Sequence, residues 1–308
     1  MVKSVSLKKN KMEHKKLFSV IAAVMGLLFM YALYNFFMSF ARGYSLEWQF
    51  FLYFIPVGAG ITGLTIFIAS GFKKSGLLRV YMCYEIISFP FTLLFYIGFF
   101  TNNNGGSAFG PVVDWHFYVG VLIDILYIAC SALGLWYLSK KRVPNIFFIG
   151  EGENRVGQFE PAGAGLRFAN RLIDGVMVLV VLVKGLGSLY YWINQDLVAD
   201  SPALIYVFEI PLLLMYYLLL ESIFNTTAGK CATNTTIVND SGGRPAFGQV
   251  LGRTFCRLIP FEAFSFFGAG ARGWHDSITN TYVVQSIDAD DAAANEITLD
   301  AETNPVQL

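Results

Sequence analysis

The chain has 308 residues, of which 55% are hydrophobic, 16% aromatic and only 14% charged. That composition is typical of a membrane protein and argues against a soluble globular protein with a charged surface. The 22 basic residues balance the 22 acidic ones, so the net charge indicates no nucleic-acid partner.

Six apolar segments are long enough to cross a bilayer, which requires about 20 mostly apolar residues. In chain order they are residues 17–41, 50–70, 77–100, 115–139, 172–193 and 203–224. The first is too long to be the apolar region of a cleaved signal peptide. The sequence therefore predicts an all-α, polytopic membrane protein with six transmembrane helices.

Basic residues are concentrated in alternate connections between these segments. Six lysines lie within residues 1–16, two follow the second segment as Lys73 and Lys74, and residues 140–142 are all basic. Lysine and arginine favour the cytoplasmic side of a membrane. We therefore expect a multi-pass protein of the cell inner (cytoplasmic) membrane, with the lipid bilayer as its surroundings and both termini in the cytoplasm.

A polar segment with several glycines and prolines follows the fourth span and divides the chain. No lysine or arginine occurs after Arg272, and the acidic end of the chain has the composition of a disordered segment. The expected parts are a basic cytoplasmic tail (1–16), a four-span bundle (17–142), a cytoplasmic linker (143–166), a second membrane domain (167–284) and an acidic disordered tail (285–308).

Short elements are predicted after the sixth span. Residues 258–271 are apolar but too few to cross a bilayer, and a proline and a glutamate interrupt them, so they indicate a re-entrant or interfacial segment. Residues 248–257 predict an amphipathic helix whose arginines lie at the membrane surface. The β-branched stretches 235–240 and 280–285 predict a two-strand element at the cytoplasmic face.

Several ionisable side chains fall within the predicted spans, where each costs about 2.5–3.5 kcal/mol at mid-helix unless it finds a partner or water. Lys184 and Glu209 have similar depths in antiparallel spans, so we expect them to pair, either permanently or until Glu209 is protonated. Glu85 and Asp124 have no basic neighbour in the sequence. They are either neutral, hydrogen-bonded groups or part of a proton or cation relay.

The second half carries a set of ordered motifs. Arg167 precedes the fifth span and Asp174 lies early in it, and then come "FNTTAGK", "GRPAFGQVLGRTFCRLIPFEAFSF" and "RGWHDSITNTYVV". This set, over roughly residues 164–284, resembles the RDD family of membrane proteins, which is named for one arginine and two aspartates. The matching positions are Arg167, Asp174 and Asp276. The resemblance implies transport, because some members are described as sodium/proton antiporters.

The arginine and the two aspartates are expected to meet at the inner mouth of the membrane domain. There they either contact an ion or substrate or clamp the helix ends. Arg171 lies three residues before Asp174, on the same helical face. Glu221 has a similar depth in the sixth span, so Arg171 and Glu221 are expected to form a structural charge network.

No catalytic residue is predicted, and the chain is not expected to be an enzyme or to carry a cofactor. It contains no Walker loop, GxGxxG, GxSxG or HExxH motif. Its four cysteines form no CxxC pair, and its three histidines are scattered, so His275 beside Asp276 does not indicate a metal site.

Two functions remain open. The first is a secondary carrier that exchanges a monovalent cation for protons, with the ion pathway at Arg167, Asp174, Asp276, Lys184, Glu209, Asp124 and Glu85. The alternative is a non-transporting membrane scaffold or assembly factor. A hydrated cavity that touches Asp174, Glu209 or Asp124 favours the carrier, whereas dry packing around them favours the scaffold. The sequence gives no oligomeric state.

Overall fold

The computed structural model describes residues 2–41, 48–103, 115–149, 156–192, 203–259, 262, 265, 273–289 and 292. The chain divides into two compact units. The first unit comprises residues 1–135 and 177–210, and the second comprises residues 136–176 and 211–308. Each is described separately below.

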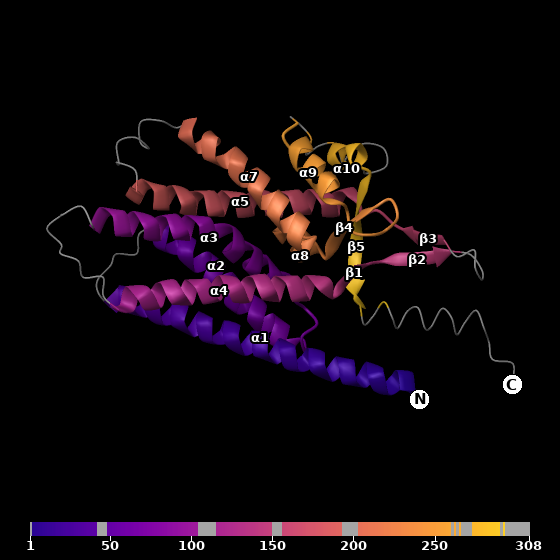
Figure 1. The fold of residues 1–308 in the computed structure, drawn as a ribbon, viewed down its shortest axis with the longest axis horizontal. Helices are drawn as coiled ribbons and strands as arrows, with labels where there is room; N and C mark the ends of the chain where they lie inside the picture. Colours follow the sequence, from indigo (N-terminus) through magenta and orange to yellow (C-terminus); the bar gives the residue numbers. More distant parts are fainter. Residues whose placement is uncertain are drawn as a thin grey trace. The chain divides into compact units, whose positions relative to one another are not determined.

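Six long helices coincide with the six predicted spans (Figure 1). They are α1 (Val2–Ala41), α2 (Trp48–Ala69), α3 (Gly76–Asn103), α4 (Trp115–Lys140), α5 (Ala164–Trp192) and α7 (Ala203–Phe224). Among the described residues, Lys16–Tyr34, Gly76–Leu94 and Tyr118–Lys140 are long and apolar enough to cross a membrane. The protein is therefore a helical membrane protein, and the count of six crossings stays a prediction.

Two helices begin eight or more residues before the predicted span. Helix α1 starts at Val2, so residues 2–16 of the expected basic tail are helical. Lysine is a good helix former, and this stretch contains no glycine or proline to end the helix. Helix α5 starts at Ala164, eight residues before the predicted span, and its first turns carry Arg167 and Arg171.

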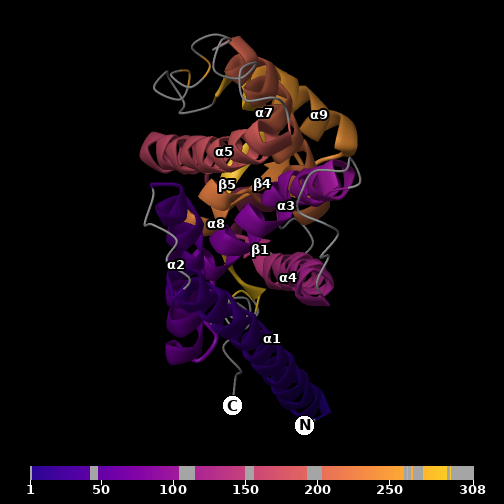
Figure 2. The same ribbon diagram turned by 90° about the vertical axis from the view of Figure 1, so that its left-hand side faces the viewer.

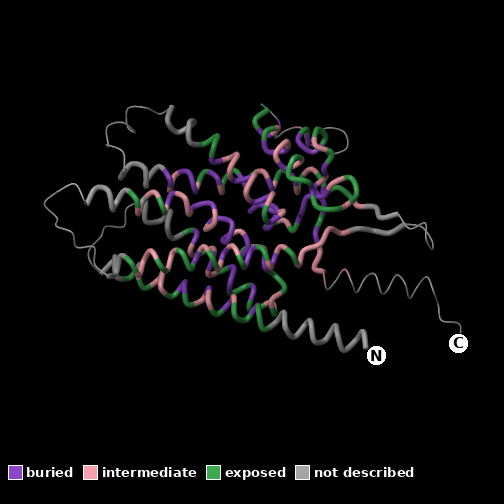
Figure 3. The backbone as a smooth tube through the Cα atoms, viewed as in Figure 1, coloured by how far each residue is buried: buried purple, intermediate pink, exposed green. Residues whose placement is uncertain are grey.

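Small residues allow close helix packing in the first unit. A Cβ added at Gly63 of α2 would lie 2.7 Å from the backbone nitrogen of Leu78 in α3, and one added at Gly60 would meet the rings of Phe29 and Tyr81. These glycines therefore serve packing, as small residues do between membrane helices. Figure 3 shows exposed positions along α1 and α4, as expected of helices surrounded by lipid.

The second unit contains a three-stranded antiparallel sheet in the order β1-β5-β4. Strand β4 (Thr235–Asn239) pairs with β5 (Thr281–Asp288), with Thr236 opposite Val284, so the predicted strand pair is confirmed. Figures 1 and 2 both show β4 and β5 side by side. Strand β1 (Arg142–Pro144) pairs with the end of β5, which places residues 285–288 in the sheet and not in the predicted tail.

The predicted linker also contains structure that the sequence analysis missed. Strands β2 (Ile146–Ile149) and β3 (Val156–Phe159) form an antiparallel pair within it. Ala162 forms a small apolar core with Ile237 of β4 and Val283 of β5, and the partly buried Leu166 packs against it.

The described residues of the second unit also form three short helices: α8 (Ala228–Thr233), α9 (Phe247–Cys256) and α10 (Trp274–Ile278). Helix α9 is the predicted amphipathic helix. Most of the predicted re-entrant segment 258–271, and most of the acidic tail, lie outside the described residues.

Candidate functional site

An aspartate held between two arginines lies at the centre of the second unit. Asp276 of α10 makes ion pairs through one oxygen with Arg167 of α5 and through the other with Arg253 of α9. All three side chains are at most 2% exposed. The Nε of Arg167 also donates to the carbonyl oxygen of Ala162 at 2.8 Å. Asp276 therefore joins three helices that are far apart in the sequence.

Glu221 of α7 extends this network. It accepts from Lys230 Nζ at 2.8 Å, from Arg257 Nη2 at 2.6 Å and from Arg253 Nε at 3.4 Å. Arg253 thus links Glu221 to Asp276. Because a buried charge without a partner costs several kcal/mol, these contacts tie α7, α8, α9 and α10 into one arrangement. Glu221 thus pairs with Lys230, Arg253 and Arg257, and Arg171, which was expected in the same network, is not among these partners.

Asp174 is held differently, by three neutral donors. Its Oδ1 accepts from the Tyr216 hydroxyl at 2.6 Å and from the Gly229 amide at 2.7 Å, and its Oδ2 accepts from the Thr227 hydroxyl at 2.9 Å. Among the described residues no cation lies within ion-pair distance of it. The donors come from α7 (Tyr216), from the N-cap of α8 (Thr227) and from α8 itself (Gly229).

Arg171 lies on the same helical face as Asp174, as expected, but forms no ion pair with it among the described residues. Arg171 instead donates to the Tyr217 hydroxyl at 3.0 Å, and its guanidinium lies 5.7 Å from the centre of that ring. Arg167, by contrast, is buried against Asp276.

His275 contacts two carboxylates. Its Nδ1 forms a hydrogen bond with Glu262 Oε1, and its Nε2 lies 3.5 Å from Asp276 Oδ1. Burial lowers the pKa of His275 below its ordinary value, although the adjacent Asp276 opposes that effect. Burial alone would raise the pKa of Asp276, but Arg253, His275 and Arg167 outweigh it and hold the pKa well below its usual range. At neutral pH Asp276 is therefore ionised and His275 neutral.

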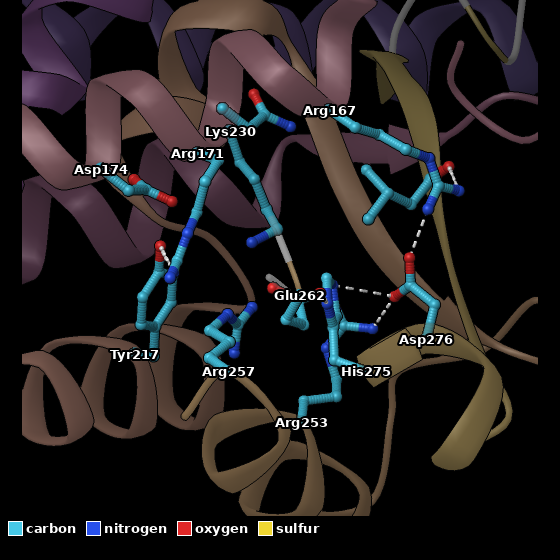
Figure 4. A pocket seen from close by; sticks show the side chains of 12 residues that line it. Arg167, Arg171, Asp174, Tyr217, Lys230, Arg253, Arg257, Glu262, His275 and Asp276 are labelled. Atoms are coloured by element: carbon cyan, nitrogen blue, oxygen red, sulfur yellow. Dashed lines mark hydrogen bonds and ion pairs between the residues drawn. The ribbon is translucent and has the colours of Figure 1, made fainter. Parts of the chain in front are cut away.

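These side chains surround a small cavity of about 30 Å³. Figure 4 shows Arg167, Arg171 and Asp174 reaching into it from one side and Tyr217, Arg253 and Arg257 from the other. Lys230, Glu262, His275 and Asp276 also line it. The one arginine and two aspartates picked out from the motifs thus share one cavity, even though only two of them touch.

Residues 161–280 match the model of the RDD family. This confirms the resemblance found in the motifs, and we refer to this segment as the RDD domain. It contains every residue of the charge cluster described above. No curated protein and no solved structure matches the chain.

Several residues of the RDD domain cluster were not predicted from the sequence. The arginines of the amphipathic helix 248–257 were expected at the membrane surface, but Arg253 and Arg257 are buried. Their spacing of four residues puts them on one helical face, which was the available signal. Their partners lie 23 to 36 residues away, so no local pattern could identify them. Lys230 was also missed. In the part of the chain that the structure describes, no group of three or more His, Cys, Asp or Glu side chains is placed to hold a metal ion.

The first unit contains a larger cavity, of about 290 Å³. It is lined by polar side chains from α3, α4 and α5: Tyr81, Glu85, Ser88, Thr92, Tyr96, Asp124, Tyr127 and Lys184. The Tyr96 hydroxyl donates to Asp124 Oδ2 at 2.5 Å. The Lys184 ammonium lies 3.4 Å from Ser88 Oγ and 5.3 Å from the centre of the Tyr84 ring.

Lys184 interacts electrostatically with both Glu85 and Asp124. The expectation that these carboxylates have no basic neighbour is therefore wrong, since the lysine comes from α5, 99 residues after Glu85 and 60 after Asp124. The predicted ion pair between Lys184 and Glu209 is also wrong. Glu209 is exposed on α7, and Lys184 lies in the cavity with Glu85 of α3 and Asp124 of α4.

Proposed function

We propose that this membrane protein is a secondary carrier that exchanges a monovalent cation for protons through the cavity of the first unit. The observation that carries the proposal is that two carboxylates and a lysine share a cavity of about 290 Å³ within predicted membrane-spanning helices. That volume accommodates on the order of 20 waters. Ionisable groups at membrane depth are costly unless water or a partner is present, and they commonly mark ion pathways.

The charges of the cavity favour exchange of one cation for one proton. With Glu85 and Asp124 ionised and Lys184 protonated, the cavity carries one net negative charge. Either a proton or one monovalent cation neutralises it, and the low dielectric disfavours both binding together. Proton and cation therefore compete for the same carboxylates, which is the requirement for coupled exchange.

The remaining parts of the proposal come from the sequence. The distribution of lysine and arginine supports cytoplasmic termini in a cell inner membrane. We propose protons and monovalent cations as the transported species, with no cofactor, catalytic residue or nucleic-acid partner involved.

A matched set of variants tests the carrier. The purified full chain is reconstituted into liposomes with an imposed pH gradient, and sodium, lithium or potassium is added. We expect at least one cation to dissipate the gradient, Glu85→Gln and Asp124→Asn to abolish the exchange, and Glu209→Gln to preserve it. Glu209 is the matched control because it is an exposed carboxylate on a predicted span, outside the cavity. If none of the three cations dissipates the gradient, the carrier proposal fails.

The alternative is a non-transporting scaffold or assembly factor, and the RDD domain cluster is the observation that favours it. Most of its charges are paired with one another, as expected of a network that only holds helices in place. A scaffold predicts no cation-dependent flux in any of these liposomes, so the same assay separates the two functions.

A further inference from the structure

The cavity of the RDD domain has an excess of positive charge. Five cationic side chains and three carboxylates line it, and Glu221, which is paired to three of those cations, adds a fourth carboxylate. His275 contributes no charge at neutral pH. The cluster therefore carries one net positive charge, with Arg171 partly exposed and the other eight charged groups buried. A net charge in a largely buried cluster is unfavourable at low dielectric.

Two arginine donors that line the same cavity are unsatisfied. Arg253 Nη2 and Arg257 Nη1 are buried and have no hydrogen-bond partner among the described residues. The two side chains are 0% and 4% exposed. An unpaired buried donor on a charged group costs more than the hydrogen bond it replaces. The excess charge and the free donors therefore occur at the same place.

We propose that this cavity binds one small monovalent inorganic anion, of the halide class, between the guanidinium groups of Arg253 and Arg257. Its volume of about 30 Å³ admits one or two groups of the size of water, which need about 10–15 Å³ each. A chloride or bromide ion fits that space, whereas a phosphate group or a lipid headgroup does not. Charge-assisted hydrogen bonds from two arginines are among the strongest available to an anion.

Water alone does not satisfy the site. Glu262 Oε2 is also buried and has no hydrogen-bond partner among the described residues, so a water beside the anion would find an acceptor there. Water in place of the anion would fill the space but leave the excess charge uncompensated.

This site goes beyond the proposed carrier, because it lies in the RDD domain and does not depend on exchange in the first unit. The bound anion acts as a fixed counterion that joins α9 to the rest of the charge cluster. Because a ligand that binds only the folded state stabilises it in proportion to the logarithm of its concentration, the melting temperature is expected to rise with chloride.

The test measures binding of radioactive chloride to the purified full chain in detergent, with gluconate keeping the ionic strength constant. We expect saturable binding of one chloride per chain, competed by bromide but not by inorganic phosphate. Arg257→Gln is expected to weaken binding at least tenfold. Arg244→Gln is the matched control, because Arg244 is exposed and lies outside the cavity, and it should bind chloride as the unmodified protein does.

A second variant covers the case in which Arg257→Gln fails to fold. Arg171→Gln removes a partly exposed cation of the same cavity and is expected to weaken chloride binding severalfold. The proposal is overturned if the unmodified protein shows no saturable chloride binding, if phosphate displaces chloride, or if Arg244→Gln weakens binding as much as the cavity variants do. Glu85→Gln, which tests the carrier, should bind chloride normally, so the two proposals can fail separately.

Discussion

Replacing Asp276 by asparagine tests whether the buried arginine–aspartate clamp stabilises the RDD domain. The substitution keeps the side-chain volume but removes the charge between Arg167 and Arg253. Arg253 keeps Glu221 at 3.4 Å, whereas Arg167 loses its carboxylate partner while remaining 2% exposed. Removing one member of a buried ion pair typically costs about 3–5 kcal/mol. In a domain of this size that cost lowers the melting temperature by on the order of 10 °C.

Thermal unfolding of the purified protein in detergent, followed by size-exclusion chromatography after heating, measures this shift. Asp240→Asn is the matched control, since it makes the same chemical change at an exposed position and should alter stability by less than about 0.5 kcal/mol. Equal melting temperatures for the two variants would refute the reasoning.

A double-mutant cycle checks the pair directly. Adding Arg167→Met to Asp276→Asn removes the stranded guanidinium, so part of the lost stability should return, because replacing both members of a buried pair is often nearly neutral. A purely additive loss would show that the two side chains do not depend on each other.

Three further predictions address other parts of the chain. The folded-state pKa of His275 lies below its ordinary value near 6.5, so as the pH falls the unfolded chain takes up the proton first. The protein therefore loses stability as the pH falls from about 7 through 6.5. His275→Gln should remove this slope of melting temperature against pH between about 7 and 5.5, and an unchanged slope would contradict the assignment. A Cβ at Gly229 would overlap the backbone of α5, so Gly229→Ala should cost about 1–3 kcal/mol in thermal unfolding, whereas Gly248→Ala, on a helix with open space around it, should cost nothing. In the liposome assay, Lys184→Met should lower the apparent KM for the transported cation about fivefold or more, because it removes a positive charge that repels the cation, and two unit charges 4 Å apart interact by about 1 kcal/mol even in water. Lys74→Met, at an exposed position, should leave that KM unchanged. A similar KM for both variants would count against the cavity as the cation site.

The helical elements were largely predictable because their signals are local. A run of about 20 apolar residues can lower its free energy in lipid only as a helix, whatever the rest of the chain does. The strand pair 235–240 with 280–285 was also predictable, because its β-branched residues and the flanking turn residues lie in the sequence itself. The short strands of the linker were not, since Arg142–Pro144 forms a strand only because β5 supplies its hydrogen-bonding partners.

The charge partners divide in the same way. Motifs in the sequence identified Arg167, Asp174 and Asp276, and the cost of charges in lipid made it necessary that Lys184 find compensation. Depth along two antiparallel spans suggested Glu209 as its partner, but depth fixes only one coordinate. Rotation of α5 about its own axis decides which neighbour the lysine meets, and that rotation depends on side-chain packing along the whole helix.

The sequence by itself therefore determined that this chain is a helical membrane protein, that its second half carries an RDD domain, and that ionic groups must be compensated inside it. Only the tertiary structure decided the pairings: Asp276 with two arginines, Asp174 with neutral donors, and Lys184 beside Glu85 and Asp124. The physical reason is that the energy of a buried charge depends on the positions of groups contributed by several helices, and those positions are set only when the helices pack.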